Sequence, residues 1–307
     1  MPPIFRFALR AAALAGAALS MTGCSIKRMA INSLGTAVAS GSTSTFARDE
    51  DAELIRDAVP FALKTIESLI EQSPKHRGLL TAAASGFTQY GYAFLQQDAD
   101  YIEAKDLEKA TQMRQRAKKL YLRAADYGWR GLEVGIPGFR AQFAADPDAA
   151  LSKATRRDVS LLYWTGAAWA AALSVDVNDA ELSVRQTSIE KMMHRALALD
   201  EGFDQGALHD FFISWEAAHA ATGGSMAKAR EHFAAAVRLS KGLRVAPYVS
   251  LAESVAINEN NRKEFELLLQ QALAVDIEKT PDQKLVNVIS QRRARWLLSR
   301  IDDLFVN

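Results

Sequence analysis

The chain has 307 residues, of which 49% are hydrophobic, enough to bury a large core. Its 37 lysines and arginines nearly balance its 36 aspartates and glutamates, and the two signs are interspersed. This balance argues against nucleic acid as a partner, because phosphate binding requires a basic surface. A single cysteine also excludes an internal disulfide.

The amino terminus predicts a bacterial lipoprotein signal peptide at residues 1–23. Two arginines precede an uncharged apolar run at residues 11–20, and the lipobox-like tetrapeptide MTGC ends at Cys24. We expect cleavage before Cys24 and lipid attachment to this cysteine, which would anchor the protein to a membrane. The alternative is an ordinary buried cysteine that follows a signal peptide cleaved elsewhere.

The residues after the lipobox indicate location and a tether. Ser25 stands where an aspartate favours retention in the inner membrane under enteric-type sorting. We therefore expect the periplasmic face of the outer membrane rather than the inner membrane. Small polar residues at 35–45 are typical of a flexible linker, so residues 24–48 are interpreted as lipidated Cys24 and its tether.

Residues 49–307 are predicted to form one all-α domain. Apolar residues recur there at intervals of three and four, and the alternating pattern of strands is scarce. Turn-forming clusters, among them residues 128–138 and 223–224, divide the region into roughly ten helices. The last helix is expected at residues 285–305, where Arg293 and Arg300 lie close to the apolar stripe. They either snorkel to solvent or pair with a carboxylate across a cleft.

Four of the expected helices share one spacing of apolar residues, which ends in an alanine. The four sets are Ala117, Tyr121, Ala124; Ile189, Met193, Ala196; Ala229, Phe233, Ala236; and Phe265, Leu269, Ala272. This spacing is typical of the second helix of tetratricopeptide-like repeats. It predicts a tetratricopeptide-like array of helical hairpins, an α-α superhelix. The alternative is an irregular bundle in which alanines recur by chance.

Two segments, residues 79–95 and 159–175, contain no charged residue and should be buried on most sides. Their modest hydrophobicity favours core helices over membrane spans. Their interior glycines at 86, 91 and 166 require either tight packing or room for a ligand.

The aromatic residues of these two segments form the candidate binding site. They are Phe87, Tyr90, Tyr92, Phe94, Tyr163, Trp164 and Trp169. Buried tyrosine and tryptophan bring polar atoms that need partners. The functional interpretation is an aromatic cleft for a mostly apolar or amphipathic small molecule. The alternative is a well-filled core, which aromatic residues at helical spacing usually form.

No pattern of catalytic residues stands out. The five histidines lack metal-ligand spacing, no second cysteine completes a thiolate site, and no glycine-rich phosphate loop is present. His209 and Asp210 are adjacent, so on a helix they point in different directions and do not form an acid–base pair. We therefore predict no enzyme activity, no catalytic residue, no metal and no cofactor.

Several segments resemble the T component associated with tripartite ATP-independent periplasmic (TRAP) transporters, the TatT lipoproteins. These segments are residues 85–94 (SGFTQYGYAF), 117–133, 136–139 (IPGF), 161–174 (LLYWTGAAWAAALS), 196–217 and 291–305 (QRRARWLLSRIDDLF). The resemblance implies a periplasmic lipoprotein that assembles as a homotrimer with a central pore and docks the transporter's periplasmic solute-binding protein, the P component. It implies no enzyme activity. It is compatible with a bound hydrophobic or amphipathic ligand but does not establish one.

A competing hypothesis is a helical-repeat scaffold lipoprotein in outer-membrane or cell-wall assembly, because similar arrays also serve there. A neighbouring gene for a solute-binding protein would discriminate between the two hypotheses.

Overall fold

A computed structural model of the chain describes residues 45–305, and every regular element within that range is helical. The predicted all-α class is therefore confirmed. Cys24 and nearly all of the expected tether lie outside the described residues. Within residues 45–305, none of the helices combines the length and the apolar character needed to cross a bilayer.

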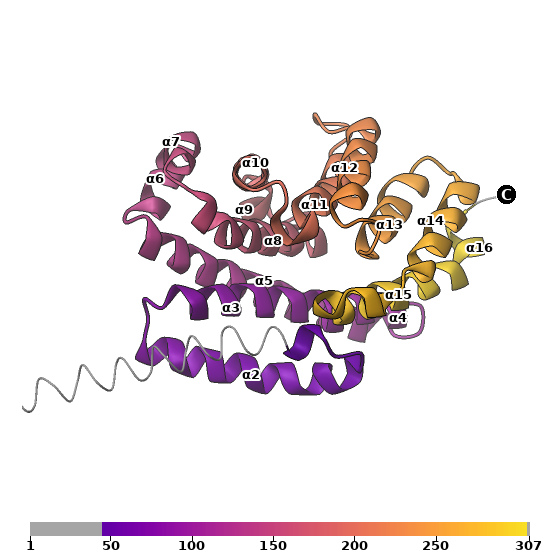
Figure 1. The fold of residues 1–307 in the computed structure, drawn as a ribbon, viewed down its shortest axis with the longest axis horizontal. Coiled ribbons are helices and arrows are strands. Elements are labelled where there is room, and N and C mark those ends of the chain that lie inside the picture. The colour runs from indigo at the N-terminus through magenta and orange to yellow at the C-terminus, as the bar shows by residue number, and fades with distance from the viewer. Residues whose placement is uncertain (1–44, 306–307) are drawn as a thin grey trace, which may run out of the picture.

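The chain forms helices of very different lengths (Figure 1). They are α2 (Ala52–Gln72), α3 (Arg77–Gly91), α4 (Gln97–Ile102), α5 (Leu107–Gly135), α6 (Phe139–Ala145), α7 (Pro147–Ser152), α8 (Val159–Val175), α9 (Ala180–Ser183), α10 (Gln186–Leu199), α11 (Ala207–Ala218), α12 (Met226–Leu239), α13 (Ala246–Leu251), α14 (Arg262–Ala274), α15 (Lys284–Ser299) and α16 (Ile301–Leu304). Two π-helical turns, η1 (Tyr92–Gln96) and η4 (Ala252–Ala256), extend α3 and α13. Short 3-10 turns complete the chain: η2 (Arg156–Asp158), η3 (Phe203–Gln205), η5 (Ile277–Lys279) and η6 (Pro281–Gln283).

Polar residues fix the starts of many helices. A side-chain oxygen just before the first turn accepts hydrogen bonds from backbone N–H groups that have no partner within the helix. Asp51 does so for α2, Asp106 for α5, Asp146 for α7, Ser225 for α12 and Asn261 for α14. Local sequence therefore favours these helix boundaries.

Helices that follow one another pack in pairs, and the pairs stack along an arc (Figure 1). The pairs are α3 with α5, α8 with α10, α11 with α12 and α13 with α14. The four predicted apolar sets lie on the second helix of each pair, and their last alanines at 124, 196, 236 and 272 are fully buried. Alanine at these points lets neighbouring helices approach closely. The tetratricopeptide-like repeat itself stays a prediction.

The predicted break at residues 128–138 is wrong in its first part, because α5 continues to Gly135. A Cβ on Gly128 would lie 2.1 Å from Thr165 Oγ1, and one on Gly131 would lie 2.5 Å from Leu161 Cδ2. These glycines therefore permit close contact between α5 and α8 and do not interrupt the helix. The chain turns only later, at Gly138, whose φ is +79°.

The interior glycines of α3 and α8 have the same explanation. A Cβ on Gly86, Gly91 or Gly166 would lie 2.6, 2.7 or 2.6 Å from side-chain atoms of Leu63, Tyr121 or Met193, respectively. Tight packing, one of the two sequence interpretations, thus applies to all three, and Gly86 also lines the cavity described below.

The last long helix, α15, returns to the amino-terminal helices and closes the array. Its Ile289 joins Ile55 of α2 and Ala93 and Phe94 of η1 in one buried cluster. The predicted helix at residues 285–305 is in fact two helices, because α15 ends at Ser299 and α16 follows Arg300. Two elements almost 200 residues apart in sequence, η1 and α15, are therefore in contact. Both contribute residues to the lining of the cavity described next.

Candidate functional site

A cavity of about 1160 Å³ lies inside the closed array. Its lining comes mainly from α2, α3, η1, α8, α11, α13, η4 and α15, with residues of η3 and η6, so the first and last long helices of residues 45–305 both contribute. The space is larger than most small-molecule pockets, and its walls are predominantly apolar with a few polar groups. The arrangement is therefore suited to hold a small molecule with an apolar body.

Five of the seven aromatic residues proposed from the sequence line this cavity. They are Tyr90, Tyr92 and Phe94 on the α3–η1 helix and Tyr163 and Trp164 on α8. The rings of Tyr90 and Phe94 lie 5.6 Å apart, and those of Tyr163 and Trp164 lie 4.9 Å apart. Two segments distant in sequence thus supply one aromatic wall.

The other two proposed residues do not line the cavity and pack in the core. Phe87 is 4% exposed and stacks on Tyr127 at 6.1 Å. Trp169 is 7% exposed and contacts Trp129 at 5.0 Å. Both point toward α5, which carries Tyr127 and Trp129, because they lie on the opposite helix faces from the cavity. For these two residues the filled-core interpretation holds.

The aromatic wall also contains residues that sequence reasoning missed. Phe211 and Trp215 stack one turn apart on α11 at 5.4 Å, and Phe203 lies 5.2 Å from Tyr163. The candidate aromatic residues came from the two segments without charged residues, and α11 was not among them because it contains and adjoins charged residues. The four-residue interval between Phe211 and Trp215 was the available signal.

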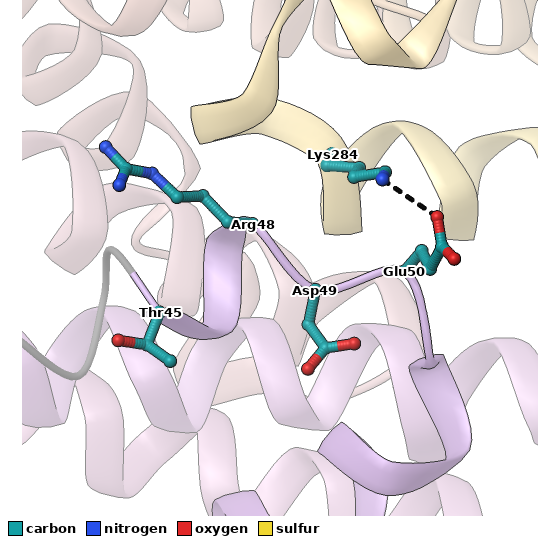
Figure 2. A pocket seen from close by; sticks show the side chains of 5 residues that line it. All are labelled: Thr45, Arg48, Asp49, Glu50 and Lys284. Atoms are coloured by element: carbon teal, nitrogen blue, oxygen red, sulfur yellow. Dashed lines mark ion pairs between the residues drawn. The ribbon is translucent and has the colours of Figure 1, made fainter.

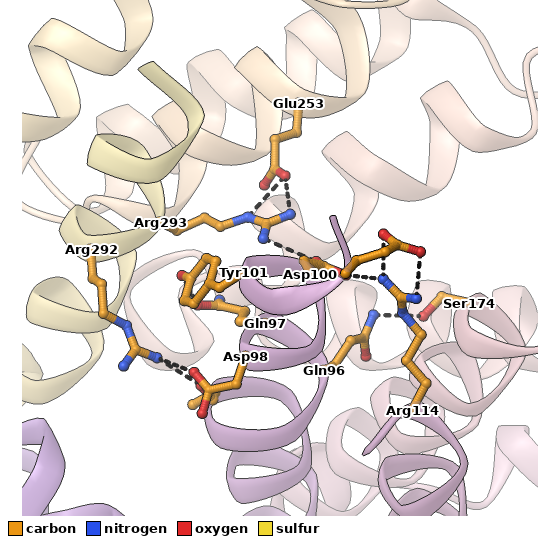
Figure 3. A network of polar contacts seen from close by, with 12 residues as sticks. Gln96, Gln97, Asp98, Asp100, Tyr101, Arg114, Ser174, Glu253, Arg292 and Arg293 are labelled. Carbon is orange, nitrogen blue, oxygen red and sulfur yellow. Dashed lines mark hydrogen bonds and ion pairs between the residues drawn. The ribbon is translucent and has the colours of Figure 1, made fainter. Parts of the chain in front are cut away.

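One polar group of the cavity surrounds Arg293 of α15. Its Nε and Nη2 donate to Glu253 Oε1 of η4 at 3.0 and 2.6 Å, and its Nη1 lies 2.9 Å from Asp100 Oδ2 (Figure 3). Tyr92 lines the cavity and keeps 46% of its surface accessible; partial loss of hydration, and then the charge of Glu253, raises its pKa. The Tyr92 hydroxyl therefore stays protonated and can donate a hydrogen bond. Arg293 pairs across the cleft, whereas Arg300 pairs locally with Asp303 at 3.1 Å.

A second polar group surrounds Arg244, which is 6% exposed. Its Nη1 donates to the backbone oxygen of Asp204 and, at 3.0 Å, to Asp204 Oδ2. Asp210 of α11 lies nearby and accepts a hydrogen bond from Ser250 Oγ at 2.8 Å. Burial raises the pKa of Asp210, and the charge of Arg244 opposes that shift.

His209 points away from this group, as its position next to Asp210 on a helix predicts. Its Nδ1 lies 2.8 Å from His232 Nδ1, and its Nε2 lies 3.3 Å from Glu201 Oε1. The two histidines therefore form a structural contact between α11 and α12, outside the cavity lining. Across residues 45–305, no three His, Cys, Asp or Glu side chains are grouped so that they could hold a metal ion.

The comparisons with known proteins agree with this architecture. A family model of the TRAP transporter T-component matches residues 48–305. The chain belongs to this family. It is also 33% identical, over 307 aligned residues, to an uncharacterized protein of Treponema pallidum (strain Nichols), with 94% of this chain and 95% of that protein covered. The resemblance seen in the sequence is thereby confirmed, and with it an accessory role in TRAP transport.

In this T component, the amino-terminal turn lies at one edge of the cavity. Phe46 and Ala47 line the cavity, and the residues around them form a small polar hollow beside α15 (Figure 2). Lys284 Nζ bridges this hollow, 2.8 Å from Glu50 Oε2 and 2.8 Å from Glu278 Oε1. The turn that leads from the expected tether therefore connects α2 to the closing helix.

Proposed function

We propose that this T component is a lipid-anchored, noncatalytic accessory protein of a TRAP-type transporter. In this proposal it docks the periplasmic solute-binding protein and holds an apolar or amphipathic ligand inside the closed array. The observation that carries the ligand part is the aromatic cavity of about 1160 Å³, whose lining includes both η1 and the helix α15 that packs against it. A cavity of this size and lining can bury most of a small molecule's surface.

The anchor, location and assembly are proposed on sequence and family grounds. Cys24 would carry the lipid and place the protein at the periplasmic face of the outer membrane. Stacked helix pairs present extended faces, which suit both a homotrimer and docking of the P component. Family membership over residues 48–305 supports this partner class.

The ligand proposal is tested on the full chain purified from membranes. We expect mass spectrometry to find a copurifying apolar molecule, and Trp164→Ala to reduce its amount because Trp164 forms part of the cavity wall. Phe87→Leu is the matched control, since it removes a ring that lies in the core outside the cavity. Thermal melts followed by circular dichroism check that both variants fold. Ligand content that is unchanged in Trp164→Ala would contradict the assignment.

The docking proposal is tested by affinity capture from native membranes. We expect the solute-binding protein of a TRAP transporter to be retained. Capture of outer-membrane or cell-wall assembly proteins without a solute-binding protein would support the scaffold hypothesis instead.

A further inference from the structure

The charge of the cavity lining indicates which ligands it accepts. We propose that the cavity binds molecules with one positive charge on an apolar body, such as alkyl or aryl amines, and that the Asp210 carboxylate is the counterion of that charge. This inference rests on the proposed ligand-binding function and specifies its chemistry.

The first support is the pairing of charges around the cavity. The charged side chains that line it are Asp204, Asp210, Arg244, Glu253, Asp282 and Arg293. Both arginines are already paired, Arg293 with Glu253 at 2.6 Å and Arg244 with Asp204 at 3.0 Å. Asp282, at 70% side-chain exposure, pairs with Arg48 at 2.6 Å. Asp210 is therefore the lining carboxylate without an ion-pair partner in the described part of the chain.

The second support is the free hydrogen-bonding capacity of Asp210. Ser250 Oγ donates to its Oδ1 at 2.8 Å, and no side chain within residues 45–305 donates to its Oδ2. A carboxylate in a predominantly apolar cavity loses hydration, and a charge there is costly unless it is paired. Arg244 offsets the charge of Asp210 only in part, because Asp204 shares the same arginine. A cationic ligand completes this compensation, a neutral ligand leaves it partial, and an anionic ligand adds another negative charge beside Asp210.

The third support is the aromatic wall around the carboxylate. Tyr163, Trp164, Phe203, Phe211 and Trp215 all line the same cavity. Phe211 and Trp215 lie on α11, the helix that carries Asp210, and Tyr163 lies 5.2 Å from Phe203, the residue before Asp204. Aromatic faces attract ammonium groups through their ring quadrupole. A carboxylate among aromatic rings is therefore suited to an amine.

The two arginines do not make the cavity a site for carboxylates. Arg293 donates to Glu253 through two nitrogens and lies 2.9 Å from Asp100 through the third (Figure 3). Arg244 is held by Asp204, and Asp210 lies close enough to shift its pKa. Arg244 Nε is buried and has no hydrogen-bond partner among residues 45–305, but two carboxylates already act on each arginine: Asp204 and Asp210 on Arg244, and Glu253 and Asp100 on Arg293. A ligand carboxylate at either arginine would face this excess of negative charge.

The test compares three probes with one apolar body and different head groups: phenylbutylamine, phenylbutanol and phenylbutanoate, each with ring and head group at opposite ends. Binding to the full chain in lipid nanodiscs is followed by tryptophan fluorescence, with empty nanodiscs as the blank. We expect the amine to bind at least about tenfold more tightly than the carboxylate. Asp210→Asn should reduce this preference to less than about threefold. The matched control Asp282→Asn, at the exposed edge of the cavity, should preserve it.

The comparison on the unchanged protein tests the inference even if Asp210→Asn fails to fold. Equal or tighter binding of phenylbutanoate would overturn it, and so would an undiminished amine preference in folded Asp210→Asn. If phenylbutanol binds without any amine preference, the charge inference fails while the ligand cavity stands. If no probe binds and no apolar molecule copurifies, the ligand part of the proposed function fails as well.

Discussion

Arg292 donates a hydrogen bond through Nη2 to the backbone oxygen of Ala93 at 2.9 Å, across 199 residues of sequence. The π-helical turn η1 explains why this oxygen is available. The Gln97 N–H, which would bond to Ala93 in an α-helix, donates instead to Tyr92 one residue earlier. The closing helix α15 therefore donates to the Ala93 oxygen, to which Gln97 does not donate. Asp98 strengthens this contact, since it lies 3.3 Å from Arg292.

Arg292→Met should weaken closure of the array. The substitution keeps an apolar stem and leaves the Ala93 oxygen and the Asp98 carboxylate without this donor. The free energy of unfolding should therefore fall by about 1–3 kcal/mol. Urea unfolding of the full chain measures the change in the free energy of unfolding. Arg295→Met, on the exposed face of α15, is the control and should change it by less than about 0.5 kcal/mol. Equal effects of the two variants would show that the closing contact adds no stability.

Gly128→Ala should destabilise the protein, although alanine is the better helix former by about 1 kcal/mol. The added Cβ would lie 2.1 Å from Thr165 Oγ1 and 3.3 Å from Thr165 Cα, so α5 and α8 would have to separate. Overpacking of this kind costs about 1–3 kcal/mol.

The control for Gly128→Ala is Gly202→Ala. The nearest atom to a Cβ at Gly202 is 3.8 Å away, and its φ is −80°. We expect Gly202→Ala to be neutral or stabilising by up to about 1 kcal/mol. Thermal melts compare the two variants, and a gain in stability for Gly128→Ala would disprove the packing explanation.

The histidine pair between α11 and α12 should make stability depend on pH. Burial lowers the pKa of His209 below its usual 6.5, and it lowers that of His232 to about 4, with a further contribution from the charge of His209. Both rings are thus neutral in the folded state, whereas the unfolded chain binds protons below pH 6.5. The free energy of unfolding therefore has its full value above pH 6.5, and the contribution of the two histidines is lost as the pH falls toward 4.

Urea unfolding at a series of pH values measures this dependence. His232→Gln keeps a hydrogen-bonding partner for His209 and cannot titrate, so its free energy of unfolding should change less between neutral and acidic pH. A slope as steep as that of the unchanged protein would assign the acid sensitivity to other groups.

Much of the helical pattern was predictable because it is local. Residues 159–175, chosen for their lack of charge, coincide with α8. The course of α5 was mispredicted, because a glycine that permits a helix contact has the same sequence signature as one that ends a helix. Residues 79–95 form one continuous helix, but its π turn was not foreseen, since Arg292, which donates to the Ala93 oxygen in this turn, lies 199 residues away in sequence.

The candidate site was predictable only in part, for a related reason. Aromatic content pointed to α3 and α8, but the choice between cavity and core depends on which helix packs on each face. Phe87 and Trp169 meet α5 and are core residues, whereas Tyr92 and Trp164 line the cavity. Asp210 gave no signal of its own, because the cavity that it lines is built from α3, α8, α11 and α15, which are distant in sequence.

The proposed lipid on Cys24, which lies outside the described residues, can be tested by metabolic labelling. Expressed in bacteria supplied with labelled palmitate, the full chain should carry the label and sediment with membranes, because each buried methylene contributes about 0.8 kcal/mol to anchoring. Cys24→Ala should lose the label and leave the membrane fraction, whereas Ser25→Ala should retain both properties. Label that persists in Cys24→Ala would disprove the lipobox. In an enteric host, Ser25→Asp should shift the lipidated protein from the outer to the inner membrane, and an unchanged distribution would contradict the proposed sorting.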